Sequence, residues 1–199
     1  PVDLIMRTQG AEWRMPENAT LESWGQPWAA LSAAEIRRLD PRAAASHPVL
    51  DAIVRQYAAQ RKLHGERADI FGLKSGTMNV HAPYTTAHQL CGERLFVWLL
   101  AEPETAAMVF EKVAAIYRAI FARIARLTGA QPRRIQLGDC SAALLSPDTY
   151  RALVLPANRR MAAGFAAVGY HSCGASRRTD KPLPRSAVAP APPWPMMTA

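Results

Sequence analysis

Apolar residues recur at helical spacing in several stretches of the chain. The longest stripe is Val109, Val113, Ile116, Ile120, Ile124 and Leu127. Its steps of three and four residues predict one long helix that begins near Glu102-Pro103 and ends at Gly129. We expect this stripe to pack into the core of the domain.

Three further helices are predicted from their start signals. Ser32-Ala33-Ala34-Glu35 is a capping box, and Asp40-Pro41 is expected to end the short helix that follows it. A helix is predicted from His47 to Gly65, with Pro48 near its start. Ser146-Pro147-Asp148 combines a Ser N-cap, a Pro at the first helical position and an acid in the first turn.

Short apolar runs that stop at polar residues predict strands. These runs cover residues 68–73, 135–137 and 166–170, and residues 75–79 are expected to be the loop after the first of them. Residues 1–30 are expected to be irregular, with a surface hairpin or loop anchored by tryptophans. Strands that alternate with helical stripes predict an α/β fold with parallel strands and outer helices.

Composition indicates where the folded unit stops. A length of 199 residues suits one domain. Residues 175–199 are rich in proline and aperiodic, so we expect a folded unit over 1–174 and an irregular tail over 175–199. The sequence shows no apolar run long enough to span a membrane and no secretory signal pattern.

Charge and cysteine content limit the function classes. The net charge is +8, but no basic helix face interleaved with aromatic residues appears, which favours a solvated Arg-rich surface over a nucleic-acid site. Three cysteines, at positions 91, 140 and 173, are too few and too odd for a disulfide framework. This usage is typical of a reducing cytoplasm.

Reactive side chains follow two successive strands. His171 and Cys173 are two residues apart at a strand end, so both side chains are expected to face the same side. This spacing is compatible with one bound metal ion, and zinc takes such nitrogen and sulfur ligands. Asp139 is either an acid–base or substrate-orienting group, or a carboxylate that caps a turn or pairs with an arginine. Cys140 is interpreted as a small buried apolar side chain, although its position also suits a metal ligand.

An ordered set of short motifs resembles the uroporphyrinogen decarboxylase superfamily from about Pro1 to Ala175. The motifs are Gly138-Asp139, Leu145-Ser146-Pro147-Asp148-Thr149-Tyr150, Leu155-Pro156 and His171-Ser172-Cys173-Gly174. Their order is similar to the branch that includes the methylcobamide:coenzyme M methyltransferases. The resemblance implies a partial (β/α)8 TIM barrel, incomplete on its C-terminal side, because eight βα units need roughly 250 residues.

The resemblance also implies residue roles. In the methyltransferase branch the H-x-C motif, here His171 and Cys173, supplies two zinc ligands and a distant cysteine completes the set. Zinc there activates a thiol that takes a methyl group from a methylated corrinoid. The segment from His81 to Ala87 resembles a family segment that opens a helix on the active-site side, so His81 and Tyr84 are expected to bind substrate. Where true decarboxylases have a substrate-contacting tyrosine, this chain has His88-Gln89, which counts against porphyrinogen decarboxylation. His81 and His88 are also interpreted as ordinary polar residues at a loop–helix junction.

The resemblance implies zinc- and corrinoid-dependent methyl transfer to a thiol, with a small-molecule substrate or a corrinoid protein as partner. Neither nucleic acid nor a membrane is expected as a partner. The alternatives are a cofactor-free uroporphyrinogen decarboxylase of porphyrin biosynthesis and a non-catalytic, truncated or frameshifted fragment. An open barrel is expected to leave Ile135, Leu137 and Val168 without an opposite wall, and the polypeptide alone is expected to show no turnover.

Overall fold

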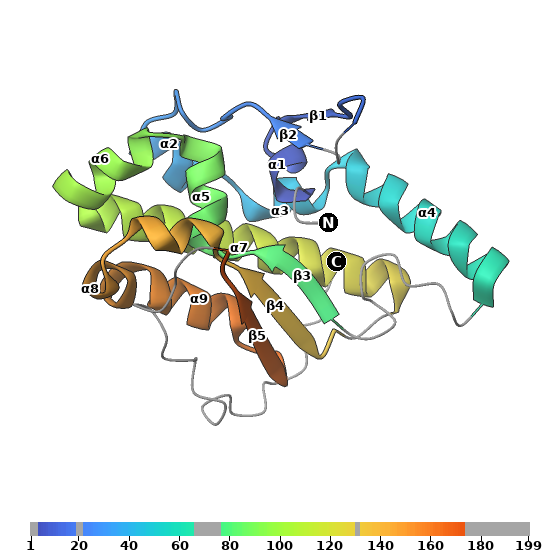
Figure 1. Cartoon of the computed structure of the whole chain (residues 1–199). Helices are drawn as coiled ribbons and strands as arrows, with labels where there is room; N and C mark the ends of the chain where they lie inside the picture. Colours follow the sequence, from blue (N-terminus) through green and yellow to red (C-terminus); the bar gives the residue numbers. More distant parts are fainter. Residues whose placement is uncertain (1–3, 19–21, 66–76, 130–131, 174–199) are drawn as a thin grey trace.

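Three parallel strands form the sheet around which the helices pack. The computed structural model describes residues 4–18, 22–65, 77–129 and 132–173. In it β3 (Thr77–His81), β4 (Arg134–Gly138) and β5 (Ala167–His171) lie side by side in the order β3-β4-β5, as Figure 1 shows. The α/β class and the strands predicted at 135–137 and 166–170 are confirmed. The strand predicted at 68–73 and the tail at 175–199 lie outside the described residues.

The assignment of residues 75–79 to a loop is wrong from Thr77 onward. Thr77–His81 is strand β3, and it pairs in parallel with β4 along its whole length. Met78 and Val80 are buried while Asn79 between them is exposed, which is the period of two that a half-buried strand requires. Only two apolar residues carry this period, so the pattern in the sequence is too short to predict the strand.

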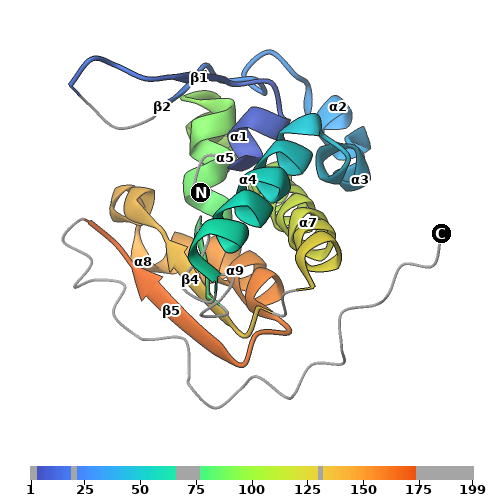
Figure 2. The same ribbon diagram turned by 90° about the vertical axis from the view of Figure 1, so that its right-hand side faces the viewer.

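The apolar side of the sheet is covered by helices. Met78 and Val80 meet Tyr117, Ile120 and Phe121 of α7 (Pro103–Thr128) around one small apolar gap. Figure 2 shows α7 and α9 (Leu155–Ala162) on one side of the strands. Ile135 and Leu137 are fully buried there, so the prediction that they lack a covering wall is wrong.

The opposite side of the sheet is polar. Asn79, Gln136 and Gly169 are aligned with one another in the strand register. Asn79 is exposed, and Gln136 and Gly169 are half-buried. The side chain of Gln136 lies against Gly169 and fills the space that a Cβ atom at this glycine would occupy. The partial barrel stays a prediction, because the parallel strands among the described residues form one sheet of three.

The long helix α7 is the centre of the core. Val109, Val113, Ile116, Ile120 and Ile124 are each at most 4% exposed, which confirms the predicted stripe over most of its length. The prediction that Leu127, the last residue of the stripe, belongs to the core is wrong, because this side chain is 37% exposed. Gly129 ends the helix in the left-handed conformation, with φ of 68°, as its position predicts.

The N-terminal part packs around this helix. It consists of α1 (Leu4–Thr8), the antiparallel hairpin β1 (Glu12–Arg14) and β2 (Glu22–Trp24), and the helices α2 (Ala33–Arg38), α3 (Pro41–Ala45) and α4 (Pro48–His64). The hairpin, the capping box of α2 and the helix from 48 to 64 are confirmed. The expectation that residues 1–30 are irregular is wrong at α1, a helix whose Leu4, Ile5 and Met6 are buried. Helix α2 ends before Asp40-Pro41, as predicted. The same pair also begins α3, because the side chain of Asp40 caps that helix.

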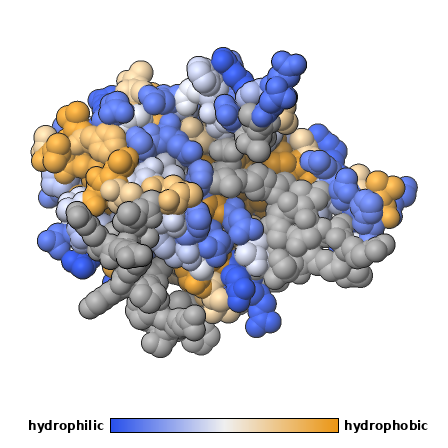
Figure 3. All heavy atoms as spheres, viewed as in Figure 1, coloured by the Kyte–Doolittle hydropathy of each residue, from blue (hydrophilic) through white to orange (hydrophobic). Residues whose placement is uncertain are grey.

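Two short helices join β3 to α7. They are α5 (Pro83–Cys91) and α6 (Arg94–Ala101). Every residue of α5 except His88 and Gln89 is buried. On α6, Val97 and Leu100 are 60% and 89% exposed, and Figure 3 shows an apolar patch over this part of the molecule.

The connection from β4 to β5 is helical almost throughout. It runs through a 3-10 turn, η2 (Cys140–Leu144), then α8 (Pro147–Thr149), a π-helical turn, η3 (Tyr150–Val154), and α9. The wide π turn precedes Pro156, which lacks the N–H that a regular helix uses at that point. Among the described helices, none is long and apolar enough to cross a membrane.

Candidate functional site

The C-terminal ends of the three strands meet at one edge of the sheet. His81, Gly138 and His171 occupy the same level of the parallel register, with Gly138 in the middle. Residues that follow parallel strands at this edge are where α/β proteins place their reactive groups. Asp139 comes directly after Gly138 and belongs to the next level, so its side chain is expected to point to the other side of the sheet from His171.

Asp139 lies inside the molecule. It has no exposed surface, and its Oδ1 accepts a 2.8 Å hydrogen bond from Oγ1 of Thr85 on α5. The same Thr85 oxygen accepts a 3.1 Å bond from the backbone N–H of Ser141. The backbone N–H of Asp139 donates a 2.8 Å bond to the carbonyl of His171. One threonine and one backbone bond therefore hold the β4 end against α5 and β5.

The second oxygen of Asp139 has no hydrogen-bond partner within the described part of the chain. Burial raises the pKa of this carboxyl, and the polar side chains of Thr85, Asn158 and Tyr150 oppose the rise. Asn158 in turn donates a 2.9 Å bond from Nδ2 to the hydroxyl of Tyr150. Asp139 is thus the centre of a buried polar cluster, formed by Thr85, Asp139, Tyr150 and Asn158, and not a group that faces solvent.

A second cluster lies at the surface of the same edge. Nε2 of His171 is 3.0 Å from Sγ of Cys173, and Sγ of Cys140 is 3.1 Å from Sγ of Cys173. All three candidate ligand atoms lie within 4.8 Å of one another. Cys173 is exposed and Cys140 is half-buried, so the interpretation of Cys140 as a buried apolar side chain is wrong. We call Cys140, His171 and Cys173 the thiol–imidazole cluster.

The two residues predicted to bind substrate lie differently. Nδ1 of His81 is 3.1 Å from Oε1 of Gln89, so this histidine is tied to the exposed side of α5. Tyr84 has no exposed surface, and its ring packs edge-on against Phe110 at 5.8 Å. Burial raises the pKa of Tyr84, and the nearby Asp139 carboxyl adds to the rise. Substrate contact by His81 and Tyr84 stays a prediction, and Tyr84 contributes to the core.

An open hollow lies beyond Gln89. Its volume is about 740 Å³, and its lining includes Glu22, Trp24 and Gln26 from the hairpin region together with Gln89. His88, one residue earlier, points elsewhere: its Nδ1 is 3.2 Å from Oγ of Ser141, and its ring meets Phe96 edge-on at 5.0 Å. His81 is therefore linked to the hollow through Gln89, whereas His88 is linked to the turn that carries Cys140.

The comparisons with known proteins decide the family. A family model described as uroporphyrinogen decarboxylase (URO-D) matches residues 8–184. The chain belongs to the URO-D family. No curated protein matches the chain.

A solved structure has a similar fold. A methyltransferase from Methanosarcina mazei superposes with a TM-score of 0.60 at 19% sequence identity. The match covers 87% of this chain and 50% of the methyltransferase, so the URO-D chain spans half the length of that protein. At this level of identity the similarity shows a shared fold.

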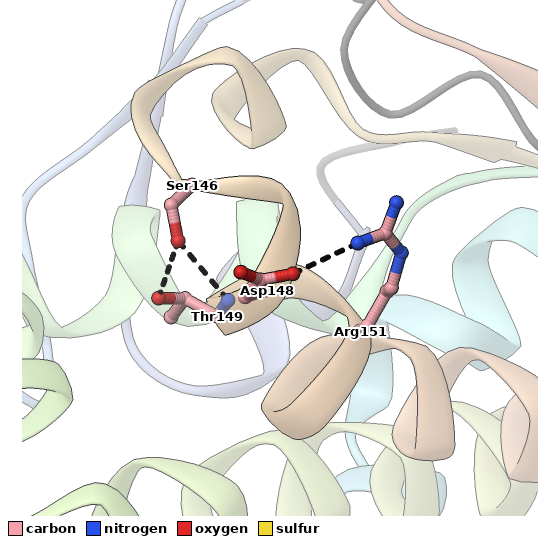
Figure 4. Close-up of polar contacts among 4 residues, drawn as sticks. All are labelled: Ser146, Asp148, Thr149 and Arg151. Atoms are coloured by element: carbon pink, nitrogen blue, oxygen red, sulfur yellow. Dashed lines mark hydrogen bonds and ion pairs between the residues drawn. The ribbon is translucent and has the colours of Figure 1, made fainter.

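The URO-D motif around Ser146 has a structural role. As Figure 4 shows, Oγ of Ser146 accepts a 3.1 Å bond from the backbone N–H of Thr149 and lies 2.9 Å from its hydroxyl. Asp148 pairs with Arg151 at 2.8 Å on the exposed side. The motif therefore starts the helical segment that positions Tyr150, whose hydroxyl is 3.3 Å from that of Tyr170 on β5.

Most of the buried polar cluster is not predicted from the sequence. No role is predicted from the sequence for Thr85 or Asn158, and Tyr150 enters only as the last residue of a family motif. The available signals were that Thr85 lies within the segment that resembles the family and that Tyr150 ends the Leu145–Tyr150 motif. Asn158 gives no local signal, because an asparagine in the middle of a helix is usually exposed.

Proposed function

We propose that this chain carries the zinc-thiolate part of a methyl-transfer site, in which a thiol is activated to accept a methyl group from a methylated corrinoid. The proposal rests on one observation, the 3.0 Å approach of His171 Nε2 to Cys173 Sγ at the exposed sheet edge. Imidazole nitrogen and thiolate sulfur are ligands that zinc prefers. The pair fits the ion in donor chemistry, in proximity and in access to solvent.

His171, Cys173 and Asp139 have different roles in the proposed site. His171 and Cys173 hold the ion at the end of β5, where an exposed position leaves access for an incoming thiol. When bound, zinc lowers the pKa of a coordinated thiol and so supplies a thiolate nucleophile near neutral pH. Asp139 acts as a positioning residue, because its carboxylate is buried and bonded to Thr85 while its backbone N–H holds the carbonyl of His171.

The assigned step is thiol binding and activation. The chain spans half of the methyltransferase with a similar fold, and complete turnover also requires a surface for the methyl donor. We therefore test the proposal by isothermal titration of the zinc-loaded chain with coenzyme M. Binding is expected to the zinc-loaded chain and to be lost in the metal-free chain and in His171→Ala.

A matched ligand separates sulfur coordination from attraction of the sulfonate. The hydroxyl analogue of coenzyme M, 2-hydroxyethanesulfonate, keeps the charge and length but lacks the thiol. It is expected to bind at least ~10-fold more weakly, because zinc prefers thiolate sulfur to a neutral hydroxyl. Equal binding of the two ligands contradicts the proposal.

Decarboxylation of uroporphyrinogen is the second candidate, favoured by the match of residues 8–184 to the uroporphyrinogen decarboxylase family model. Metal-independent loss of CO₂ from uroporphyrinogen, abolished by Asp139→Asn, distinguishes it from methyl transfer. A non-catalytic fragment is expected to bind neither coenzyme M nor uroporphyrinogen and to release no CO₂.

A further inference from the structure

Three potential ligand side chains come together at the sheet edge, although the sequence motif contains only two of them. His171 and Cys173 are close in sequence, whereas Cys140 comes from the end of the neighbouring strand, 33 residues before Cys173. Parallel pairing of β4 with β5 brings these ends together, since Gly138 is aligned with His171. We infer that Cys140 is the third protein ligand of the metal ion.

The position of Cys140 is held from both sides. The N–H of Asp139, the residue before it, bonds to the carbonyl of His171 at 2.8 Å. The N–H of Ser141, the residue after it, bonds to Oγ1 of Thr85 at 3.1 Å. The backbone of Cys140 is therefore tied to β5 on one side and to α5 on the other. A ligand held in this way loses little conformational freedom when an ion binds.

The three side chains converge on one point. The sulfur atoms of Cys140 and Cys173 are 3.1 Å apart, and no pair of the three ligand atoms is more than 4.8 Å apart. Two thiolates and one neutral imidazole balance the charge of a divalent ion and leave a fourth tetrahedral position for a substrate. Cys140 is half-buried and Cys173 exposed, so an ion held by these residues would be open to a substrate from solvent.

A disulfide is the competing use of the same two sulfurs. It leaves the imidazole of His171 without a role, although Nε2 of this residue is 3.0 Å from Sγ of Cys173. It also requires an oxidant, whereas metal binding requires only the reduced side chains. The convergence of nitrogen with both sulfurs therefore favours the metal site.

This inference rests on the proposed function, and its test separates the two. The reduced full chain is titrated with Co²⁺ under anaerobic conditions, and the sulfur-to-cobalt charge-transfer band is recorded with the bound-metal stoichiometry. One ion per chain is expected. In Cys140→Ser the band is expected to fall to about half, since one of two thiolates is lost, and the affinity to fall by more than the ~10–100-fold typical of a lost outer-shell partner.

Cys91→Ala is the matched control, because Cys91 is the remaining cysteine and is buried in α5. It is expected to keep the band and the affinity, and circular dichroism of each variant checks that the fold is retained. An unchanged band and affinity in Cys140→Ser, with loss in His171→Ala and Cys173→Ala, overturns the role of Cys140 and leaves the proposed function standing. Absence of Co²⁺ binding by the reduced wild-type chain overturns both.

Discussion

Thr85 and Asp139 are joined by a 2.8 Å hydrogen bond across 54 residues of sequence. The bond links the first turn of α5 to the residue that follows β4, and both side chains are buried. Because Thr85 also accepts the N–H of Ser141, a single hydroxyl group fixes the residues on both sides of Cys140. The buried polar cluster is thereby coupled to the thiol–imidazole cluster at the surface.

Loss of the Thr85 hydroxyl is expected to destabilise the fold. Thr85→Val removes a donor to Asp139 and an acceptor for Ser141, which is expected to lower the free energy of unfolding by ~1–3 kcal/mol. Thr85→Ser keeps both bonds and is expected to lose less than half as much. Urea denaturation measures the difference. Thr105→Val, on the exposed start of α7, serves as the control, and an equal loss there contradicts the role of Thr85.

The stability of Asp139→Asn is expected to depend on pH differently from that of the wild type. Burial raises the pKa of Asp139 above 3.8, so the folded chain holds this proton more tightly than the unfolded chain does. The wild type therefore loses stability as pH rises from the unfolded pKa through the folded one, and the loss persists at higher pH. Asparagine does not ionise, so the variant does not lose stability in this way as the pH rises. At pH 7 the variant is expected to be ~1–3 kcal/mol more stable than the wild type, the scale of an unsatisfied buried polar group.

The measurement is the difference in unfolding free energy between Asp139→Asn and wild type from pH 3.5 to pH 8. This difference is expected to grow with pH across the window above 3.8 and then to level off. A difference that is constant over the whole range shows that the carboxyl does not titrate abnormally.

Helix capping by Ser146 is expected to matter more than the adjacent ion pair. Ser146→Ala removes the bond to the N–H of Thr149 and is expected to cost ~1 kcal/mol of stability. Arg151→Ala breaks an ion pair whose side chains are 59% and 94% exposed, and is expected to cost ~0–0.5 kcal/mol. Thermal or urea unfolding of the two variants gives the order directly, and the reverse order refutes the capping role.

The apolar stripe of α7 is expected to weaken toward its end. Ile120 is 1% exposed and packs under β3, so Ile120→Ala is expected to cost ~2–5 kcal/mol. Leu127 is 37% exposed, and Leu127→Ala is expected to cost less than ~1 kcal/mol because no full cavity forms. Both are measured by denaturant unfolding. Similar losses at the two positions indicate that Leu127 is covered.

The three cysteines are expected to react in a definite order. Burial raises the pKa of Cys91 to about 12, and its side chain is 1% exposed, so iodoacetamide at pH 8 is expected to leave it unmodified in the folded chain. The exposed Cys173 is expected to react first, and bound zinc is expected to protect Cys173. Peptide mapping by mass spectrometry reads out each position. Early alkylation of Cys91 contradicts its burial.

Local sequence signals determined several helix ends and the residues at the ends of β4 and β5. The capping box at Ser32, the Ser146 cap and Gly129 each act within one turn of backbone, so the residues concerned are neighbours in sequence. The pair His171 and Cys173 is also local, since two residues in one extended segment share a side. For this reason the metal-ligand pair could be proposed before the fold was known.

Tertiary structure alone decided which side chains meet. The side of the sheet on which Ile135 and Leu137 lie is covered by α7 and α9, which depends on how distant helices pack and not on the strand itself. The placement of Asp139 follows from its bond to Thr85, and that of Cys140 from the register of β4 on β5. Such contacts join segments that are far apart in sequence, and the residue patterns within one segment carry no information about them.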